Sequence, residues 1–415
     1  MKYILYSILL FCTIGYAQSD LKDLTLKRYI ELVSDNSYEL KQSAAEISVE
    51  KSLRLKGISP PSPVVSFNYD FIPSGSSISA YEERSISLSQ SFDFPLKYFI
   101  RSQKNSYLIN ASEVNYQITR NNLLKNIKNV FFKALANKYF LDIYSRHLTS
   151  ADEFYSKSLI RKNSGEGSSL ELLTAQLQLT ESKSLYSSAA GEFNSSLQDL
   201  MALAGTGNNT DTVTFADTIK YIQLDYDLNS ILESALKENY ELIRNTLLDK
   251  SASANHKLAY LSLLPDFNFS YSKQAISGNN NFYGISFGAS IPLWFMFNQT
   301  SEINTASLEK EITGYKLSRS YIEVTHRIKK AFKEVKTKEE QLLLYKDSLM
   351  PQADEIYNIA MLNYSAGESS YLELLQARQS LLSVKLNYVN NLLNYYMALI
   401  ELESSVNMPS FKILE

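Results

Sequence analysis

The sequence predicts a mainly helical protein with a small membrane-type β component, built from one helix–strand–strand–helix unit that is used twice. The clearest observation is an internal repeat, in which Tyr38 matches Tyr240 and segment 170–175 matches segment 372–377 at an offset of 202 residues. Four short segments of strict apolar–polar alternation and two very long stretches with almost no glycine or proline complete the pattern. Self-similarity at a fixed offset indicates that one supersecondary unit is repeated.

The repeat divides the chain into two structural units joined by a polar linker. Around Pro95 and Pro292 the offset falls to 197, because the second strand-to-strand loop is shorter. The linker is rich in Asn, Asp and Thr, and we expect it on the outside of the helices rather than as a domain. The expected parts are a first repeat over residues 18–205, a linker over 206–227, a second repeat over 228–407 and a C-terminal tail over 408–415.

Residues 1–17 have the features of a secretory signal peptide. Lys2 precedes an apolar stretch, and Ala17 ends a group of small residues at the cleavage position, so we expect a mature chain that begins near Gln18. The apolar stretch is too short to cross a bilayer. Cys12, the one cysteine of the chain, lies in this stretch without the small residues that a lipoprotein signal needs. We therefore expect neither a lipid anchor nor a disulfide in the exported protein.

Charge and motif content exclude several function classes. The formal net charge is −3, which argues against a nucleic-acid partner. His147, His256 and His326 are isolated, and the chain has no Gly-rich phosphate loop, no HExxH motif and no cysteine pair. After the signal peptide, no run of 18 apolar residues predicts a transmembrane helix. We expect no enzymatic activity, no cofactor and no resident metal site.

Four segments alternate strictly between apolar and polar residues, as strands with one apolar and one polar face do. We expect strands over about 64–72, 84–94, 266–273 and 282–291, with hairpin loops over 72–84 and 274–281. The opposite face carries mainly Ser, Asn, Asp and Gly. The apolar face consists of Val65, Phe67, Tyr69, Ile86, Leu88, Phe267, Phe269, Tyr271, Ile285 and Phe287.

These strands suit a bilayer. Each is about 8–10 residues long, which is close to the length of a tilted strand that crosses a membrane. Lipid offers no hydrogen-bond partners, so membrane strands must close into a barrel, and four strands are too few to close. Three chains would supply twelve strands, an even number in the usual range. A water-soluble sheet with one face on a core has the same alternation. We favour lipid-facing strands because the helices are expected to pack on one another and the polar face suits a water-filled lumen.

Two helical stretches are too long for an ordinary globular domain. Residues 97–161 and 298–364 contain no glycine except Gly314 and no proline except Pro351. At 1.5 Å per residue each could reach roughly 95–100 Å. Their apolar positions step alternately by three and four residues, which is coiled-coil spacing. We expect each long helix to return through a tight turn as a second helix, so that the helices continue the barrel as a rigid tube.

The two helical turns, at about 162–169 and 364–370, are the best-matched parts of the repeat. Gly165 and Gly367 are expected to end the incoming helices, and Ser168 and Ser370 to cap the outgoing ones. Three residues after each serine stands a glutamate, Glu171 or Glu373, which would complete a capping box. The alternative role of both glutamates is to line the narrow mouth of the tube, where a ring of carboxylates would favour cations.

At these turns the sequence resembles a known family. The twin turn motifs, segment 89–95 after the second strand and segment 349–353 before the second turn are similar to those of the TolC family of outer-membrane factors, most of all its heavy-metal-efflux (CzcC-like) branch. The resemblance covers about residues 20–407. It implies a homotrimer in the outer membrane of a Gram-negative bacterium, with a twelve-stranded β-barrel continued by a periplasmic α-helical barrel.

The resemblance also implies partners and an activity. A periplasmic adaptor would dock at the turns and connect the trimer to an inner-membrane pump, and solutes or metal ions would pass through without catalysis or an obligatory cofactor. A duct for type I polypeptide secretion is an alternative function, and a periplasmic coiled-coil scaffold is a second one. The sequence does not identify the transported substrate.

Several residues acquire roles from the resemblance. Tyr364 matches a tyrosine of the closed-mouth network and Glu373 an acidic mouth residue. Gln376 stands where a second mouth aspartate is frequent, and Ser369 where an arginine often ties the mouth. The expected mouth residues are Glu171, Tyr364, Glu373 and Gln376. The expected adaptor-docking tips are exposed at Gly165, Leu170, Leu172, Gly367, Leu372 and Leu374.

Overall fold

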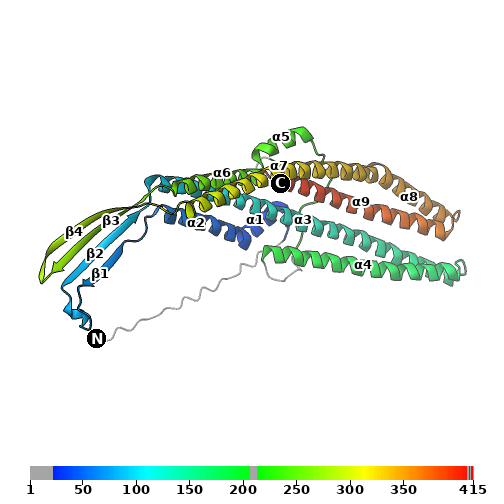
Figure 1. Ribbon diagram of the computed structural model, residues 1–415. Coiled ribbons are helices and arrows are strands. Elements are labelled where there is room, and N and C mark those ends of the chain that lie inside the picture. The colour runs from blue at the N-terminus through cyan, green and yellow to red at the C-terminus, as the bar shows by residue number, and fades with distance from the viewer. Residues whose placement is uncertain (1–21, 206–212, 409–410, 412, 415) are drawn as a thin grey trace, which may run out of the picture.

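The computed structural model describes residues 22–205, 213–408, 411 and 413–414. The predicted signal peptide and residues 206–212 of the predicted linker lie outside the described residues. The molecule is elongated, with a small sheet at one end and two helical hairpins reaching to the other (Figure 1). In the described part of the chain, no helix combines the length and apolarity that crossing a membrane requires.

The predicted duplication is confirmed, because each repeat has two short helices, two strands and two long helical arms in the same order. In the second repeat, the first arm consists of α7 and α8 with a π-helical turn between them. The first repeat comprises α1 (Leu26–Asn36), α2 (Tyr38–Ile58), β1 (Val64–Asp70), β2 (Glu83–Phe92), α3 (Pro95–Asn163) and α4 (Ser169–Ala204). The second comprises α5 (Leu228–Glu238), α6 (Tyr240–Leu261), β3 (Asp266–Ile276), β4 (Asn279–Ser290), α7 (Asn298–Leu344), α8 (Met350–Ala366) and α9 (Tyr371–Val406).

The π-helical turn, Tyr345–Leu349, ends two residues before Pro351. Proline has no N–H and its ring collides with the carbonyl group four residues earlier. A wider π turn relieves this collision and lets the arm continue into α8. The arm of the first repeat, α3, has no proline after Pro95 at its start and remains one uninterrupted helix.

The four strands form one antiparallel sheet in the order β1-β2-β3-β4. The second hairpin is tighter than the sequence pattern predicts, because only Ser277 and Gly278 connect β3 to β4. Both residues have positive φ, at 49° and 83°. A two-residue turn of this kind matches the strand twist, so pairing continues almost to the tip. The first hairpin keeps a long loop, which contains a short 3-10 helix (Ile78–Ala80).

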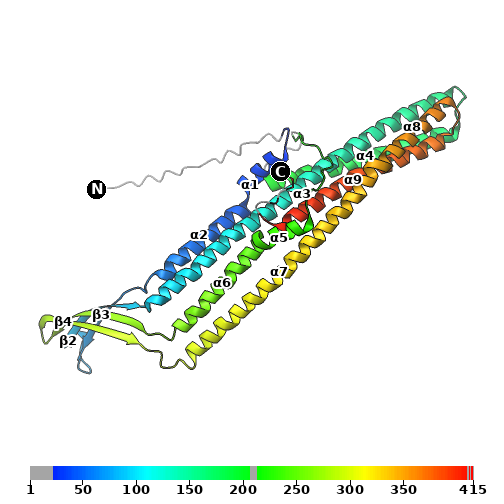
Figure 2. The ribbon, with the colours of Figure 1, turned by 90° about the horizontal axis from the view of Figure 1, so that it is seen from above.

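Four helices lie side by side in the order α2-α3-α6-α7 next to the sheet (Figure 2). Each of them leads directly into or out of one strand, so the helix order repeats the strand order β1-β2-β3-β4. Beyond this layer, α3 pairs with α4 and α8 pairs with α9 as the two long hairpins. The sheet is therefore held at the end of a continuous helical layer.

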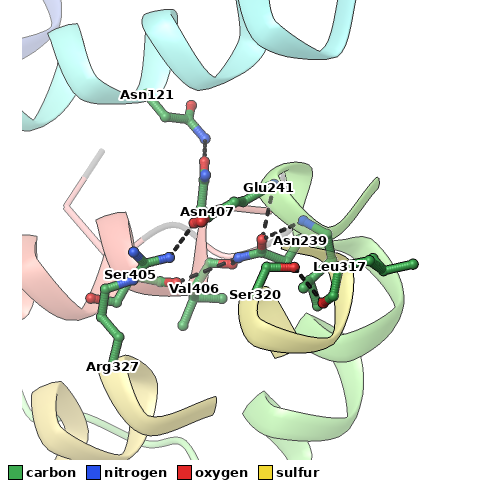
Figure 3. Close-up of polar contacts among 10 residues, drawn as sticks. Asn121, Asn239, Glu241, Leu317, Ser320, Arg327, Ser405, Val406 and Asn407 are labelled. Carbon is green, nitrogen blue, oxygen red and sulfur yellow. Dashed lines mark hydrogen bonds and ion pairs between the residues drawn. The ribbon is translucent and has the colours of Figure 1, made fainter. Parts of the chain in front are cut away.

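In each repeat a similar contact holds the junction between the two short helices, α1–α2 in the first repeat and α5–α6 in the second. In the second repeat Asn239, which is fully buried, caps α6 by accepting from the Glu241 amide at 2.9 Å. Its Nδ2 donates to the Val406 carbonyl oxygen at the end of α9 at 2.8 Å (Figure 3). In the first repeat Asn36 donates to the Ala204 carbonyl oxygen at the end of α4 at 3.0 Å. Each junction is thus hydrogen-bonded to the end of the last helix of its own repeat.

The hydrophobic core lies around the middle of the molecule, where the short helices and the connection between the repeats cover the long helices. Tyr29, Phe131 and Tyr395 are among its fully buried side chains. The described part of the predicted linker leaves most of its residues exposed but sends several side chains inward. Four of its apolar residues are buried in this core, and Leu24 pairs with Phe215 in a short parallel bridge. The buried linker residues are Val213, Phe215, Ile219 and Leu224.

Candidate functional site

One face of the sheet is apolar and exposed. All ten residues that the sequence pattern assigns to this face are exposed, from 37% at Phe269 to 83% at Phe287. The strand register aligns them in rows across the sheet, such as Val65, Leu88, Tyr271 and Ile285. Water-soluble proteins rarely leave so large a continuous apolar surface uncovered. The face therefore marks a surface that contacts lipid or another protein.

The opposite face of the sheet is hydrophilic and bonds to itself. Asn68 Nδ2 donates to Ser85 Oγ at 3.3 Å. Ser270 Oγ and Ser286 Oγ are 2.9 Å apart. Asn268 Nδ2 donates to Ser91 Oγ at 3.2 Å. Small hydroxyl and amide groups in cross-strand pairs form a surface that remains hydrated.

Polar and aromatic groups limit the apolar face at both ends. Toward the hairpins, Tyr69 lies across from Arg84, and its ring packs edge-on against Tyr81 at 5.0 Å. Toward the helices, the buried Lys97 ammonium binds the Asp266 carboxylate at 2.7 Å. Aromatic and charged residues at the two edges of an apolar band are typical of membrane–water interfaces.

The two helical turns have the predicted backbone chemistry. Gly165 and Gly367 have φ values of +83° and +79°, a left-handed conformation that glycine adopts without strain. Ser168 Oγ accepts from the Glu171 amide at 3.0 Å, and Ser370 Oγ accepts from the Glu373 amide at 3.4 Å. Both serines are therefore N-caps, of α4 and α9.

The Glu171 side chain does not complete a capping box. Its Oε1 accepts from Tyr364 Oη at 2.7 Å and from Arg161 Nη1 at 3.2 Å. Arg161 Nη1 also donates to Tyr364 Oη at 2.8 Å. The Glu171 side chain is only 13% exposed, so it is held by this triangle and does not point freely into a mouth. The triangle joins α3 and α4 to α8, and hence one hairpin to the other.

Arg161 is a functional candidate that the sequence analysis missed. It occupies the end of α3, while the family pattern directed attention to Ser369 as the position of a tying arginine. A basic residue in the last turn of a helix, ten positions before a glutamate, is a weak signal in sequence. Burial and the hydrogen bond to Glu171 raise the pKa of Tyr364 to about 12. Tyr364 therefore remains protonated at physiological pH and can donate to the glutamate.

Aromatic rings extend the contact between the hairpins below this triangle. Phe154 of α3 stacks on Tyr371 of α9 with ring centroids 4.3 Å apart, and it also approaches the Tyr364 ring at 5.8 Å. Further along, Arg378 donates to the His147 carbonyl oxygen at 2.6 Å. Burial and the Arg378 charge lower the pKa of His147 to about 4, so this histidine is neutral at physiological pH.

The other predicted tip and mouth residues are divided between surface and interior. Leu170 and Leu372 are exposed, and Leu172 is half-buried. Leu374 is only 3% exposed, so the expectation that it lies on the docking surface is wrong. It occupies a buried position of α9, because residues two apart on a helix point in nearly opposite directions and Leu372 faces outward. The mouth candidates Glu373 and Gln376 are both exposed.

The second repeat provides the decisive sequence comparison. Residues 231–408 match the model of the family described as outer membrane efflux protein. The second repeat therefore matches this family over nearly its whole length. The predicted family of outer-membrane efflux proteins is thus confirmed by this part of the chain.

Solved outer-membrane channels share the fold of this chain. VceC from Vibrio cholerae has a TM-score of 0.77 at 15% identity, over 92% of this chain and 96% of that chain. CmeC from Campylobacter jejuni has a TM-score of 0.76 at 18% identity, over 94% and 88%. The open-state MtrE channel of Neisseria gonorrhoeae has a TM-score of 0.75 at 13% identity, over 92% and 89%. No curated protein sequence matches the chain. At these identities the likeness establishes the fold.

Proposed function

We propose that three copies of this chain form the outer-membrane channel of a tripartite efflux system. Their twelve strands would close a barrel in the outer membrane, and their helices would continue it as a tunnel into the periplasm. Solutes would pass passively from an adaptor–pump complex to the outside. The observation that carries this proposal is the four-stranded sheet, which combines an exposed apolar face, a polar face and two edge strands that are unpaired on their outer side in the described chain.

The order of the elements supports closure by identical copies. Rotation about a common axis would bring β4 of one copy to β1 of the next, and with it α7 to α2. Both of these outer helices expose apolar side chains that a single chain leaves uncovered. These are Val49, Leu53 and Leu55 on α2, and Leu308, Ile312 and Tyr315 on α7. Closed rotational symmetry is the usual arrangement of identical subunits.

The turn end of the hairpins is the proposed docking site for the periplasmic adaptor. Gly165 and Gly367 form the two tips, and Leu170 and Leu372 are exposed beside them. Glu373 and Gln376 are the proposed lining of the periplasmic mouth. The contact of Arg161, Glu171 and Tyr364 would hold the two hairpins of each chain together while the mouth is closed.

Type I polypeptide secretion is the runner-up function, because a duct for protein has the same architecture. Small solutes and metal ions are the favoured cargo, following the resemblance to the heavy-metal-efflux branch. The pump and adaptor would select the cargo. A periplasmic scaffold is disfavoured, since it has no use for an exposed apolar sheet face.

Membrane fractionation followed by mass measurement in detergent tests the assembly. We expect the protein in the outer membrane as a trimer. A water-soluble monomer, or one that sediments with the periplasm, would overturn the proposal.

Efflux measured in cells tests the docking site. Leu170→Glu combined with Leu372→Glu should abolish efflux while trimers remain in the membrane, because both side chains are exposed at the tips. Gln379→Glu, at an exposed position farther along α9, is the matched control and should leave efflux unchanged. Normal efflux in the double variant would place docking elsewhere.

A further inference from the structure

The connection between β4 and α7 exposes five consecutive large apolar residues, Leu293–Phe297. Their exposed fractions range from 49% at Phe295 to 77% at Leu293. The segment includes Trp294, the one tryptophan of the chain, which is 75% exposed. A continuous run of this size is costly to leave in water and marks an interaction surface.

Several backbone groups of this segment bond locally, to one another or to residues next to the segment. Phe297 N donates to the Trp294 carbonyl oxygen at 3.0 Å, and Thr300 N donates to the Phe295 carbonyl oxygen at 3.0 Å. Leu293 N donates to the Ile291 carbonyl oxygen at 2.9 Å. Backbone groups that enter lipid must be satisfied internally, because hydrocarbon supplies no partner. The segment therefore forms a compact turn whose apolar side chains face outward.

The equivalent segment of the first repeat is built differently. At the offset of 197 residues, Lys97 corresponds to Trp294. Pro95 starts α3 at once, and Lys97 is buried against Asp266. The neighbouring Phe94 ring packs on Phe267 at 6.2 Å. The first junction thus buries Lys97 and exposes Leu96 and Phe99 nearby, whereas the second exposes five large apolar side chains in succession.

The exposed segment continues the apolar face of the sheet toward the helices. It follows Phe287, Ala289 and Ile291 of β4 and its extension. An apolar hollow of about 670 Å³ lies on the adjoining part of the sheet. Its apolar lining is Phe92, Phe267, Phe269, Phe287 and Ala289. The segment thus lies at the helix end of the surface that is proposed to contact lipid.

We propose that Leu293–Phe297 is a membrane-interface anchor, which inserts into the phospholipid leaflet on the helix side of the sheet. The inference rests on the proposed function, since it requires the sheet to cross a membrane. No charged residue lies between Lys273 and Glu302 in the sequence, so the segment and the strand before it carry no charge that would have to enter lipid. Tryptophan and phenylalanine favour the headgroup–acyl boundary, where an aromatic ring is buried and the indole N–H stays near water. An anchor at the start of α7 would fix the depth of the sheet in the bilayer.

Tryptophan fluorescence tests the anchor without any substitution, because Trp294 is the only tryptophan in the sequence. The purified protein would be reconstituted in phosphatidylcholine vesicles whose acyl chains are brominated either near the headgroup or near the methyl end. We expect strong quenching by lipid brominated near the headgroup and weaker quenching by lipid brominated near the methyl end. Weak lipid quenching would overturn the anchor. Quenching by acrylamide would then place Trp294 in water, and protection from acrylamide would place it between subunits.

Two tryptophan transfers separate failure of the anchor from failure of the proposed function. Trp294→Phe with Phe67→Trp moves the emitter to the apolar sheet face, where quenching is expected if the sheet crosses the bilayer. Trp294→Phe with Leu177→Trp moves it to an exposed position of α4, where lipid should not quench it. Quenching at residue 67 without quenching at Trp294 would reject the anchor alone. Absence of quenching at both positions would reject the membrane sheet as well.

Discussion

Glu171 and Glu373 occupy equivalent positions of the two repeats, three residues after a capping serine, yet their surroundings are opposite. The Glu171 carboxylate is held by Arg161 and Tyr364 between the two hairpins, while Glu373 is exposed and its Oε1 lies 3.3 Å from Ser370 Oγ. The position that corresponds to Arg161 in the second repeat is Asn363, which carries no charge. Lys162 is the counterpart of Tyr364, so both partners of Glu171 differ in the other repeat, and these differences separate a structural glutamate from a solvent-facing one.

The sheet gives the opposite result, because there the two repeats have equivalent surroundings. Phe67 and Phe269 correspond at the offset of 202 residues, and both are exposed on the apolar face. Strands of both repeats also place small polar side chains on the other face. Duplication has preserved chemistry where both copies meet the same medium. It has allowed divergence where each copy meets a different neighbour.

The largest expected effect tests whether the strands of the two repeats are equivalent in the sheet. Phe67→Arg and Phe269→Arg should each destabilise the inserted protein by roughly 2–4 kcal/mol per chain, the cost of an arginine near the midplane on the lipid face. Asn68→Ala and Asn268→Ala on the polar face should be tolerated. Reversible unfolding in lipid vesicles would measure all four variants. Equal damage from the asparagine variants would reverse the assignment of the faces.

The second prediction tests the difference between the two glutamates. Glu171→Gln should lower stability by about 1–3 kcal/mol, because it removes a charge-assisted partner from Arg161 inside the hairpin contact. Glu373→Gln is the matched control and should change stability little, since glutamine can still serve a capping box. Thermal unfolding compares the two variants, and planar-bilayer recording should show lower cation preference only for Glu373→Gln. Equal losses of stability would contradict the comparison.

The third prediction uses the raised pKa of Tyr364, which burial and Glu171 shift from 10 to about 12. A tyrosine that holds its proton more tightly in the folded state stabilises that state below its unfolded pKa. Its contribution is lost as pH rises from about 10 through 12. Tyr364→Phe should remove this part of the alkaline stability loss and should also raise conductance. The measurement is the free energy of unfolding of wild type and variant from pH 9 to 12. If the difference between the two does not change with pH, Tyr364 is not the titrating group.

The smallest expected effect comes from placing an arginine in the second turn at the position that corresponds to Arg161. Asn363→Arg gives the second turn the residue that the first turn has, at an exposed position ten residues before Glu373. An exposed ion pair contributes only about 0–1 kcal/mol, so stability should hardly change. Cation preference in bilayer recordings should fall, because the new guanidinium neutralises Glu373. Asn363→Gln is the uncharged control, and an identical fall with glutamine would exclude the charge as the cause.

Much of the fold could be predicted because it is encoded by local periodicity. Alternation identified all four strands and their apolar face, and coiled-coil spacing with few glycines identified the long arms. The candidate site was predicted less completely. The caps at Ser168 and Ser370 follow from residues a few positions apart, whereas the Arg161 contact joins helices that are distant in sequence.

The sequence by itself determined the duplication, the two faces of the sheet and the glycine turns, since each depends on the residues within one element. Only the tertiary structure decided which side chains those elements bury. Leu374 is hidden and Leu372 is exposed because of the rotation of α9 against its neighbours. Phe215, in a polar connection, enters the core because Leu24 pairs with it across nearly half of the chain. Glu171 became part of the hairpin contact because packing placed Tyr364, a residue of the other repeat, within hydrogen-bonding distance.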